Sequence, residues 1–134
     1  MRGPAHLFVY GTLRAGSRGG PAKLLSERAV RIGLARVRGA LYRVGAYPGL
    51  VLGSASDSDR VQGDVFALPD DPSLLAALDR YEGCGPDDPR PHAYERVRAD
   101  AELDDGRRVS AWTYAWLGRV DPADRIPEWP WPRA

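Results

Sequence analysis

The pattern of hydrophobic and polar positions predicts strands along most of the chain. Residues 7–10, Leu-Phe-Val-Tyr, form an apolar run without alternation, which is typical of a strand buried on both faces. Residues 28–38 alternate and predict a second strand, and residues 39–44 predict another that is either separate or continuous with it through a bend. The same pattern predicts further strands at 50–52, 61–67, 93–99 and 108–116.

Glycine and proline mark the expected turns between these strands. Residues 47–49, Tyr-Pro-Gly, place both where a turn favours them. Residues 104–106, Asp-Asp-Gly, predict a tight hairpin turn between the last two strands. Gly63 lies inside its strand, where glycine is typical of a bulge or of close approach by a neighbouring strand.

One segment carries a clear helical period. Residues 74–81 are expected to form a helix, with Asp70 or Asp71 as its N-cap and Pro72 near its first position. A shorter helical turn is expected at 21–25. Because most strands follow one another without helical crossovers, the pattern favours a small mixed or mainly antiparallel β-barrel with one principal helix over a doubly wound sheet.

Composition narrows the classes of function. The 134 residues are expected to form one domain, and 19 basic and 18 acidic residues give a net charge of +1. The arginines are scattered, so neither a nucleic acid nor an anionic membrane is an expected partner. The lone Cys84 cannot form an internal disulfide and the chain opens without an apolar signal segment, so a cytoplasmic location is expected.

The first predicted strand stops abruptly at Gly11. Glycine adopts φ > 0 freely and admits close backbone contacts, and small residues follow it to Gly16. Such a loop at the end of a central strand is suited to hold an anion or a carbonyl oxygen, and an ordinary tight turn is the alternative. A phosphate loop is excluded because Ser17-Arg18 stands where Lys-Ser/Thr is required.

Glu82 is the carboxylate best suited to proton transfer. It shares a helical face with Leu75 and Leu78, so it is expected to point inward from the last turn of the helix. Desolvation and the negative end of the helix dipole would both raise its pKa toward the range useful for proton transfer. The alternative is that the helix frays at Tyr81 and that Glu82 points into solvent.

Other candidates for chemistry are weaker. Cys84 follows a helix C-terminus, where the dipole raises the pKa of a thiol, so it is expected to be a poor nucleophile. His6 and His92 lie far apart without ligands at metal spacing, so no metal site is expected. Asp79 and Glu82 are one turn apart, as in a glycosidase pair, but nothing else in the sequence supports sugar binding.

Aromatic residues on the last two strands offer walls for a pocket. Tyr94 shares a strand face with Arg96, and Tyr114 shares one with Trp116. If both faces look inward, they supply aromatic surfaces and hydroxyl donors. The alternative, favoured for Trp112 and Trp116, is a sheet surface of cross-strand Tyr, Trp and Arg pairs.

Four segments of the chain resemble those of a known family, in the right order. They are residues 10–14, 47–50, 61–66 and 78–84, the last followed by Tyr94-Glu95-Arg96. Over roughly residues 6–118, the chain resembles the γ-glutamylcyclotransferase-like superfamily, most closely its γ-glutamylaminecyclotransferase and AIG2-like branch. The Tyr-Gly-Thr-Leu loop combined with the later Asp-x-x-Glu-Gly is the specific part of this resemblance.

The resemblance implies an α+β fold, a small mixed β-barrel with short flanking helices and an enclosed cavity. The resemblance covers a core of about 6–118; the Pro- and Trp-rich tail at 119–134 carries no such match and is expected to be extended because of its prolines. It also implies conversion of a small γ-glutamyl substrate to 5-oxoproline and a free amine, without metal or cofactor. The family's catalytic Glu falls on Glu82. Its substrate-holding loop falls on Tyr10, Gly11, Thr12 and Leu13.

In the mechanism that this implies, the substrate's own α-amine is the nucleophile. Glu82 would carry a proton from the α-ammonium to the departing amine, and N–H groups of residues 11–13 would bind the α-carboxylate or the developing oxyanion. Tyr94 or Tyr114 would close the pocket. Three alternatives stay open: a family member that binds a γ-glutamyl ligand without turnover, a cyclotransferase for a specialised γ-glutamyl metabolite, and an interaction domain that docks through its tryptophans.

Gly11→Val is predicted to abolish the activity. Valine occupies the space through which a ligand approaches the backbone, and its branched side chain resists φ > 0. The measurement is the rate of 5-oxoproline release by the variant and the wild type. A fully active Gly11→Val enzyme would reduce the loop to an ordinary turn.

Overall fold

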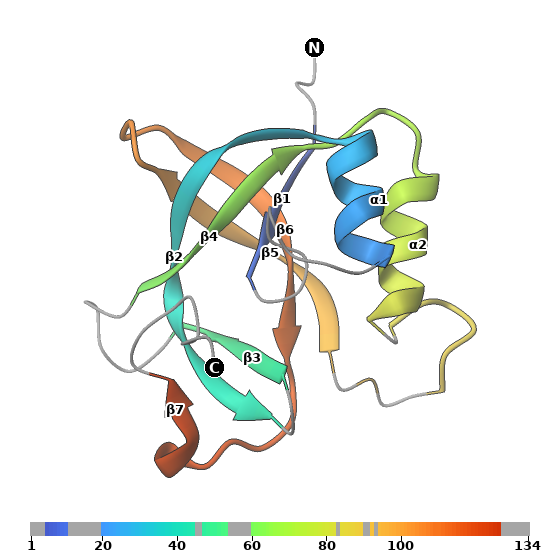
Figure 1. Cartoon of the computed structure of the whole chain (residues 1–134). Helices are drawn as coiled ribbons and strands as arrows, with labels where there is room; N and C mark the ends of the chain where they lie inside the picture. Colours follow the sequence, from blue (N-terminus) through green and yellow to red (C-terminus); the bar gives the residue numbers. More distant parts are fainter. Residues whose placement is uncertain are drawn as a thin grey trace.

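A 15-residue strand, β2 (Val30–Val44), is the longest element and pairs with four other strands (Figure 1). The computed structural model describes residues 5–10, 20–44, 47–53, 60–82, 84–89, 92 and 94–126. The other elements of this part of the chain are β1 (His6–Val9), α1 (Gly20–Arg28), β3 (Tyr47–Leu52), β4 (Arg60–Ala67), α2 (Ser73–Tyr81), β5 (Tyr94–Leu103), β6 (Arg108–Trp116), the 3-10 helix η2 (Pro122–Asp124) and β7 (Arg125–Ile126).

Five of the strands close into a barrel. β1 pairs antiparallel with β4, β4 with β2, β2 with β5, and β5 with β6. The parallel contact between Leu7 of β1 and Trp112 of β6 closes the ring and makes the barrel mixed. The structure thus confirms the predicted α+β fold, a small mixed β-barrel with short helices beside it.

The two halves of β2 have different neighbours. Residues 30–38 pair with β4, whereas residues 39–44 pair with β3. β7 also pairs with the second half of β2, and β3 meets β6 in parallel where Leu50 lies beside Ala115. The segments predicted at 28–38 and 39–44 are therefore one continuous strand, which begins only after α1 ends at Arg28.

The turn predicted at residues 47–49 is wrong, because these residues begin β3. Val44 of β2 pairs with Tyr47, so this strand starts three residues before the predicted position. Gly49 serves a different purpose. A Cβ atom there would lie 2.9 Å from Cβ of Trp116 and 2.8 Å from Cγ2 of Val44. The glycine therefore allows β6 to approach β3 rather than bending the chain.

β1 is buried on both faces, which explains its unbroken apolar run. Phe8, together with Tyr10 just after the strand, belongs to the cluster of side chains that fills the barrel. Leu7 and Val9 belong to a second cluster, between the barrel and the helices. The helices contribute Leu25, Leu74 and Leu78 to this second cluster. Figure 1 shows α1 and α2 side by side on one outer side of the barrel.

The start of α2 differs from the prediction by one or two positions. Pro72, rather than Asp70 or Asp71, occupies the N-cap position, and its side chain makes no capping bond. The Asp71 carboxylate nevertheless accepts a hydrogen bond from the backbone N–H of Ser73 at 2.9 Å. Asp71 also forms an ion pair of 3.0 Å with Arg28, which ties the start of α2 to the end of α1. The carboxylate thus acts as a cap from one residue further upstream.

The β5–β6 hairpin forms as predicted, although β5 extends four residues beyond the predicted strand at 93–99. The hairpin turn at residues 104–106 includes a hydrogen bond from the N–H of Gly106 to the carbonyl of Leu103. α1 is longer than the helical turn predicted at 21–25. Neither α1, α2 nor η2, the helices of the described residues, is long and apolar enough to cross a membrane.

Gly63→Ala is predicted to destabilise the fold. A Cβ atom at this position of β4 would lie 2.2 Å from the carbonyl oxygen of Val9 and 2.7 Å from Cζ of Phe8, so the predicted close approach of a strand is confirmed. The expected loss in free energy of unfolding is about 1–3 kcal/mol, measured by urea denaturation. Gly33→Ala in β2 is the matched control, since a Cβ there meets nothing within 4 Å. Equal stability of the two variants would contradict the account.

Candidate active site

Glu82 lies at the C-cap of α2, one residue after the helix ends. Its φ and ψ of −80° and −2° are still helical, and its backbone N–H bonds to the carbonyl of Leu78 at 2.9 Å. Leu78 and Leu74 are buried against the barrel, whereas Leu75 is only partly buried. The helix therefore does not fray before Glu82, and this residue continues the buried face of α2.

Burial raises the pKa of Glu82 to about 7, compared with an ordinary value of 4.5. The direction agrees with the sequence prediction, and desolvation is the cause. The pKa of Tyr94 rises to about 12, mainly through burial and in part through the charge of Glu82. Burial chiefly, and Glu82 to a smaller extent, also raises the pKa of Tyr10. The Glu82 carboxylate therefore lies near both phenols, which are 84 residues apart in the sequence.

Tyr10 fixes the end of β1 to two other strands. Its hydroxyl donates a hydrogen bond to the backbone carbonyl of Tyr114 in β6 and accepts one from the backbone N–H of Leu50 in β3 at 3.1 Å. The side chain is buried. Gly11, Thr12 and Leu13, the other residues of the predicted substrate-holding loop, lie outside the described residues. Of the predicted loop, the structure describes Tyr10, the residue from which it starts.

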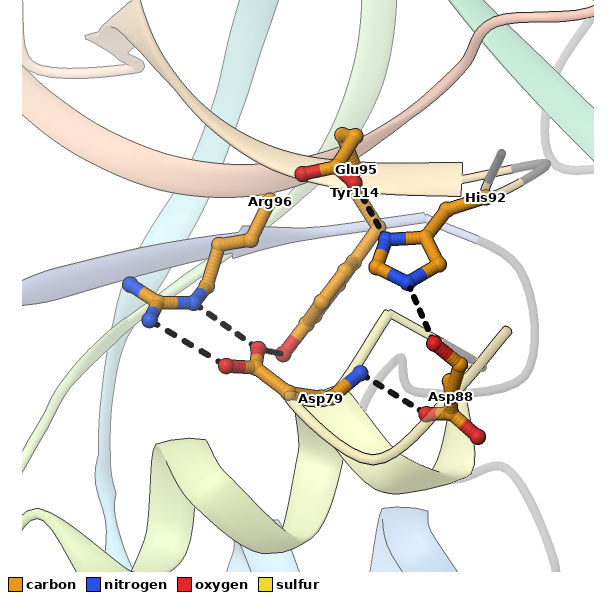
Figure 2. Close-up of polar contacts among 7 residues, drawn as sticks. Asp79, Asp88, His92, Glu95, Arg96 and Tyr114 are labelled. Atoms are coloured by element: carbon orange, nitrogen blue, oxygen red, sulfur yellow. Dashed lines mark hydrogen bonds and ion pairs between the residues drawn. The ribbon is translucent and has the colours of Figure 1, made fainter. Parts of the chain in front are cut away.

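Asp79 joins the last turn of α2 to the β5–β6 hairpin (Figure 2). Its Oδ1 accepts hydrogen bonds from Nε of Arg96 at 2.8 Å and from the hydroxyl of Tyr114 at 2.7 Å, and its Oδ2 accepts one from Nη2 of Arg96 at 3.2 Å. The Asp79 side chain is 15% exposed. These bonds occupy both oxygens of Asp79, which leaves the glycosidase-type pair with Glu82 without support.

Aromatic and arginine side chains alternate across one face of the β5–β6 hairpin. Tyr94 packs edge-on against Trp116 with ring centroids 5.1 Å apart. The guanidinium groups of Arg96 and Arg98 lie 4.4 and 4.3 Å from the ring centroid of Trp112. Trp112 and Trp116 thus form the cross-strand pairs that the sequence favoured for them.

The segment after α2 is held back onto β5. The side chain of His92 contacts the carboxylate of Glu95 and the backbone carbonyl of Asp88 (Figure 2). The carboxylate of Asp88 accepts a hydrogen bond from the N–H of Gly85 at 2.8 Å. Sequence analysis did not find this cluster, although the i, i+3 spacing of His92 and Glu95 is a local signal for such a contact.

The pKa of the Cys84 thiol shifts in the predicted direction. Burial, and next the charge of Asp79, raise the pKa of the Cys84 thiol to about 11, so it is a poor nucleophile. No group of three or more His, Cys, Asp and Glu side chains within the described ranges is placed to hold a metal ion. The absence of a metal from the reaction stays a prediction.

The enclosed cavity also stays a prediction. Within the described part of the chain, a surface hollow of about 340 Å³ lies between the start of β2 and the β5–β6 turn. Residues 31–34, 103–105 and 107 line it, and none of the predicted site residues does. The hollow is therefore separate from the site around Glu82.

Comparison with known proteins identifies the family. The sequence matches the protein family described as "Gamma-glutamyl cyclotransferase, AIG2-like" over residues 7–133. The chain belongs to this family. Membership implies a cyclotransferase activity in general terms, and it confirms the resemblance carried by the Tyr10 and Glu82 segments. No curated protein matches the sequence significantly.

Solved structures share the fold at low identity. An AIG2-like protein from Mus musculus superposes with a TM-score of 0.68 and 23% identity, over 92% of this chain and 83% of its own. At5g39720.1 from Arabidopsis thaliana gives 0.65 and 26%, over 94% of this chain and 76% of its own. YkqA from Bacillus subtilis gives 0.65 and 24% over 92% of this chain, which spans only 38% of the YkqA chain.

Glu82→Gln is predicted to stabilise the protein at neutral pH. Folded Glu82 keeps its proton up to about pH 7, whereas unfolded glutamate loses it near 4.5, so the folded state binds more protons between these values. The free energy of unfolding of the wild type therefore falls as pH rises through this window. Glutamine removes the effect, and the variant should be more stable than wild type by roughly 1–3 kcal/mol above pH 7.

Urea denaturation at pH 4.5 and pH 8 measures this difference. The stabilisation by Glu82→Gln should be present at pH 8 and absent at pH 4.5. Glu102→Gln is the matched control, because the Glu102 side chain on β5 is 50% exposed and should show no such dependence. A Glu82→Gln variant with the wild-type pH dependence would mean that Glu82 is solvated in the folded state.

Proposed function

We propose that the protein converts a γ-glutamyl amine or γ-glutamyl amino acid to 5-oxoproline and a free amine, with Glu82 as the general acid and base. The observation that carries this proposal is the Glu82 carboxylate, partly buried at the end of α2 and close enough to Tyr10 and Tyr94 to raise the pKa of both, with its own pKa raised to about 7. A carboxylate with this pKa both accepts and returns a proton at neutral pH. Family membership supplies the reaction class.

The reaction needs few groups from the protein. The substrate's α-amine attacks the γ-carbonyl carbon, a C–N bond closes the five-membered ring, and the original C–N bond to the amine breaks. The α-ammonium loses two protons as it becomes the ring N–H, and the departing nitrogen gains two and leaves as an ammonium ion. Because the nucleophile is part of the substrate, the enzyme must fold the substrate into the attacking geometry and carry these protons. No step in this sequence calls for a metal or a cofactor.

Glu82 is suited to both halves of the proton transfer. Its deprotonated form accepts the proton of the α-ammonium, and its protonated form then donates to the leaving nitrogen. An exposed glutamate would hold a proton too weakly to donate it at neutral pH. Burial corrects this by destabilising the ionised form, at a cost in folding stability.

The remaining assignments concern substrate binding. Residues Gly11, Thr12 and Leu13 are proposed to bind the α-carboxylate or the developing oxyanion through backbone N–H groups. Tyr10 supports this role because its hydroxyl anchors the start of the loop to β3 and β6. Tyr94, whose phenol lies near Glu82, is proposed to close the pocket. The Tyr114 hydroxyl is engaged with Asp79, so Tyr94 is the better supported of the two candidates.

The alternative functions differ in the role that Glu82 would have. A non-catalytic member would bind γ-glutamyl compounds and leave them uncyclised. A specialised cyclotransferase would use the same chemistry with a different leaving amine. An interaction domain would use its tryptophans for docking, but Trp112 and Trp116 are already stacked with side chains of the same hairpin. The near-neutral pKa of Glu82 favours a catalytic role.

Glu82→Gln is predicted to lower kcat by about 10²- to 10⁴-fold, because it keeps the size of the side chain and removes the base. The assay is 5-oxoproline release from a panel of γ-glutamyl amines, γ-glutamyl dipeptides and glutathione. For the best substrate, kcat/KM of the wild type should rise with pH through about 7, as Glu82 loses its proton.

Glu102→Gln, the same chemical change at an exposed site on β5, is the control and should keep wild-type kcat. Undiminished 5-oxoproline release by Glu82→Gln would refute the mechanism. Binding of a panel member by the wild type without any 5-oxoproline would favour the non-catalytic alternative.

A further inference from the structure

Tyr114 connects the two parts of the proposed site. Its backbone carbonyl accepts the hydrogen bond of the Tyr10 hydroxyl, at the start of the predicted substrate loop. Its own hydroxyl donates to Asp79, one helical turn before Glu82. One residue of β6 therefore contacts the elements that carry the loop and the base, which lie more than sixty residues apart in the sequence.

Asp79 binds its surroundings through both its side chain and its backbone. The side chain contacts β5 through Arg96 and β6 through Tyr114, which face each other in the register of these strands. The Asp79 carbonyl accepts a hydrogen bond from the N–H of Cys84 at 2.9 Å, just beyond Glu82. Glu82 thus lies inside the turn that this bond closes between Asp79 and Cys84.

Arg96 completes the arrangement with little freedom of its own. Its guanidinium forms the two parallel hydrogen bonds to Asp79 and lies over the Trp112 ring at 4.4 Å. With Asp79 bound at its edge and the Trp112 ring against its face, the guanidinium is fixed in orientation as well as in distance. The arrangement therefore resists both sliding and rotation of the last turn of α2 on the hairpin.

We propose that Asp79, Arg96 and Tyr114 are positioning residues, which hold the Glu82 carboxylate at a set place relative to the loop that begins at Tyr10. This inference rests on the proposed function, because it assigns these residues a role through Glu82. None of the three needs to touch the substrate. Cyclisation depends on the geometry of proton transfer, so a small displacement of Glu82 lowers kcat more than it changes KM.

The same attachment holds Glu82 in its partly buried position. The groups that respond to the charge of Glu82 are Tyr10, Tyr94 and Cys84, from the end of β1, from β5 and from the segment after α2. If the last turn of α2 loosens, water reaches the carboxylate and its pKa falls toward the ordinary value. In Asp79→Asn, the unpaired Arg96 cation acts in the same direction, because a positive charge favours the ionised form.

Asp79→Asn and Tyr114→Phe test the proposal. We expect kcat to fall about tenfold to a hundredfold in Asp79→Asn and about threefold to tenfold in Tyr114→Phe, with KM within about threefold of wild type. The pH at which kcat/KM is half-maximal should decrease in both. Tyr114→Phe removes a single hydroxyl, so it keeps the test decisive if Asp79→Asn folds poorly.

Asp71→Asn is the matched control. It breaks an Asp–Arg pair and a capping bond at the other end of α2. It should lower the urea midpoint while leaving kcat and the pH profile unchanged. If Asp79→Asn and Tyr114→Phe behave like Asp71→Asn, the contacts serve stability alone and the proposal is overturned.

A second measurement separates this inference from the proposed function. Carboxyl ¹³C NMR follows the titration of Glu82 in the ligand-free protein, with its signal assigned by its loss in Glu82→Gln. A lower titration midpoint of Glu82 in Asp79→Asn and Tyr114→Phe, but not in Asp71→Asn, supports the positioning role. This holds even if the wild type releases no 5-oxoproline, a result that would refute the proposed function alone. Unchanged midpoints in both variants refute the positioning role.

Discussion

A four-residue strand buried on both faces governs the architecture. β1 closes the barrel through its parallel contact with β6, and its side chains alternate between the interior of the barrel and the layer beneath the helices. Its buried residues, Leu7–Val9, are all apolar, and the chain becomes polar again only after the strand ends. Tyr10 lies at that end, and its hydroxyl forms hydrogen bonds with backbone groups of β3 and β6.

The partial burial of Glu82 lowers the folding stability at neutral pH, and we propose that it also suits the carboxylate to proton transfer. A carboxylate at a helix C-terminus is ordinarily solvated, and burial makes its ionised form costly. The cost is the origin of the near-neutral pKa. The Asp79–Arg96 pair lies one turn away and has its charges matched, whereas the pKa of Glu82 is raised by desolvation. The end of α2 therefore carries two acidic groups in different surroundings: Asp79, which is paired, and Glu82, which we propose transfers protons.

Sequence reasoning reached the features that depend on local signals. The unbroken apolar run at β1, the helical face that contains Glu82 and the glycine that admits a neighbouring strand at position 63 are each encoded within a few residues. The turn predicted at residues 47–49 was wrong, because the sequence alone does not distinguish a glycine that bends the chain from one that leaves room for Trp116. The contacts of Asp79 with Arg96 and Tyr114 were also missed. They depend on strand register and on how α2 docks against the barrel, which are set by contacts distant in sequence.

The central claim is that a buried carboxylate assists an intramolecular attack by the substrate's α-amine, and isotope labelling tests it most directly. A γ-glutamyl substrate with ¹⁵N at its α-amine is turned over in H₂¹⁸O, and the products are analysed by mass spectrometry. The account predicts 5-oxoproline that retains ¹⁵N in its ring and contains no ¹⁸O. Glutamate with ¹⁸O in its γ-carboxylate would contradict it, because water, activated in place of the amine, would then be the nucleophile.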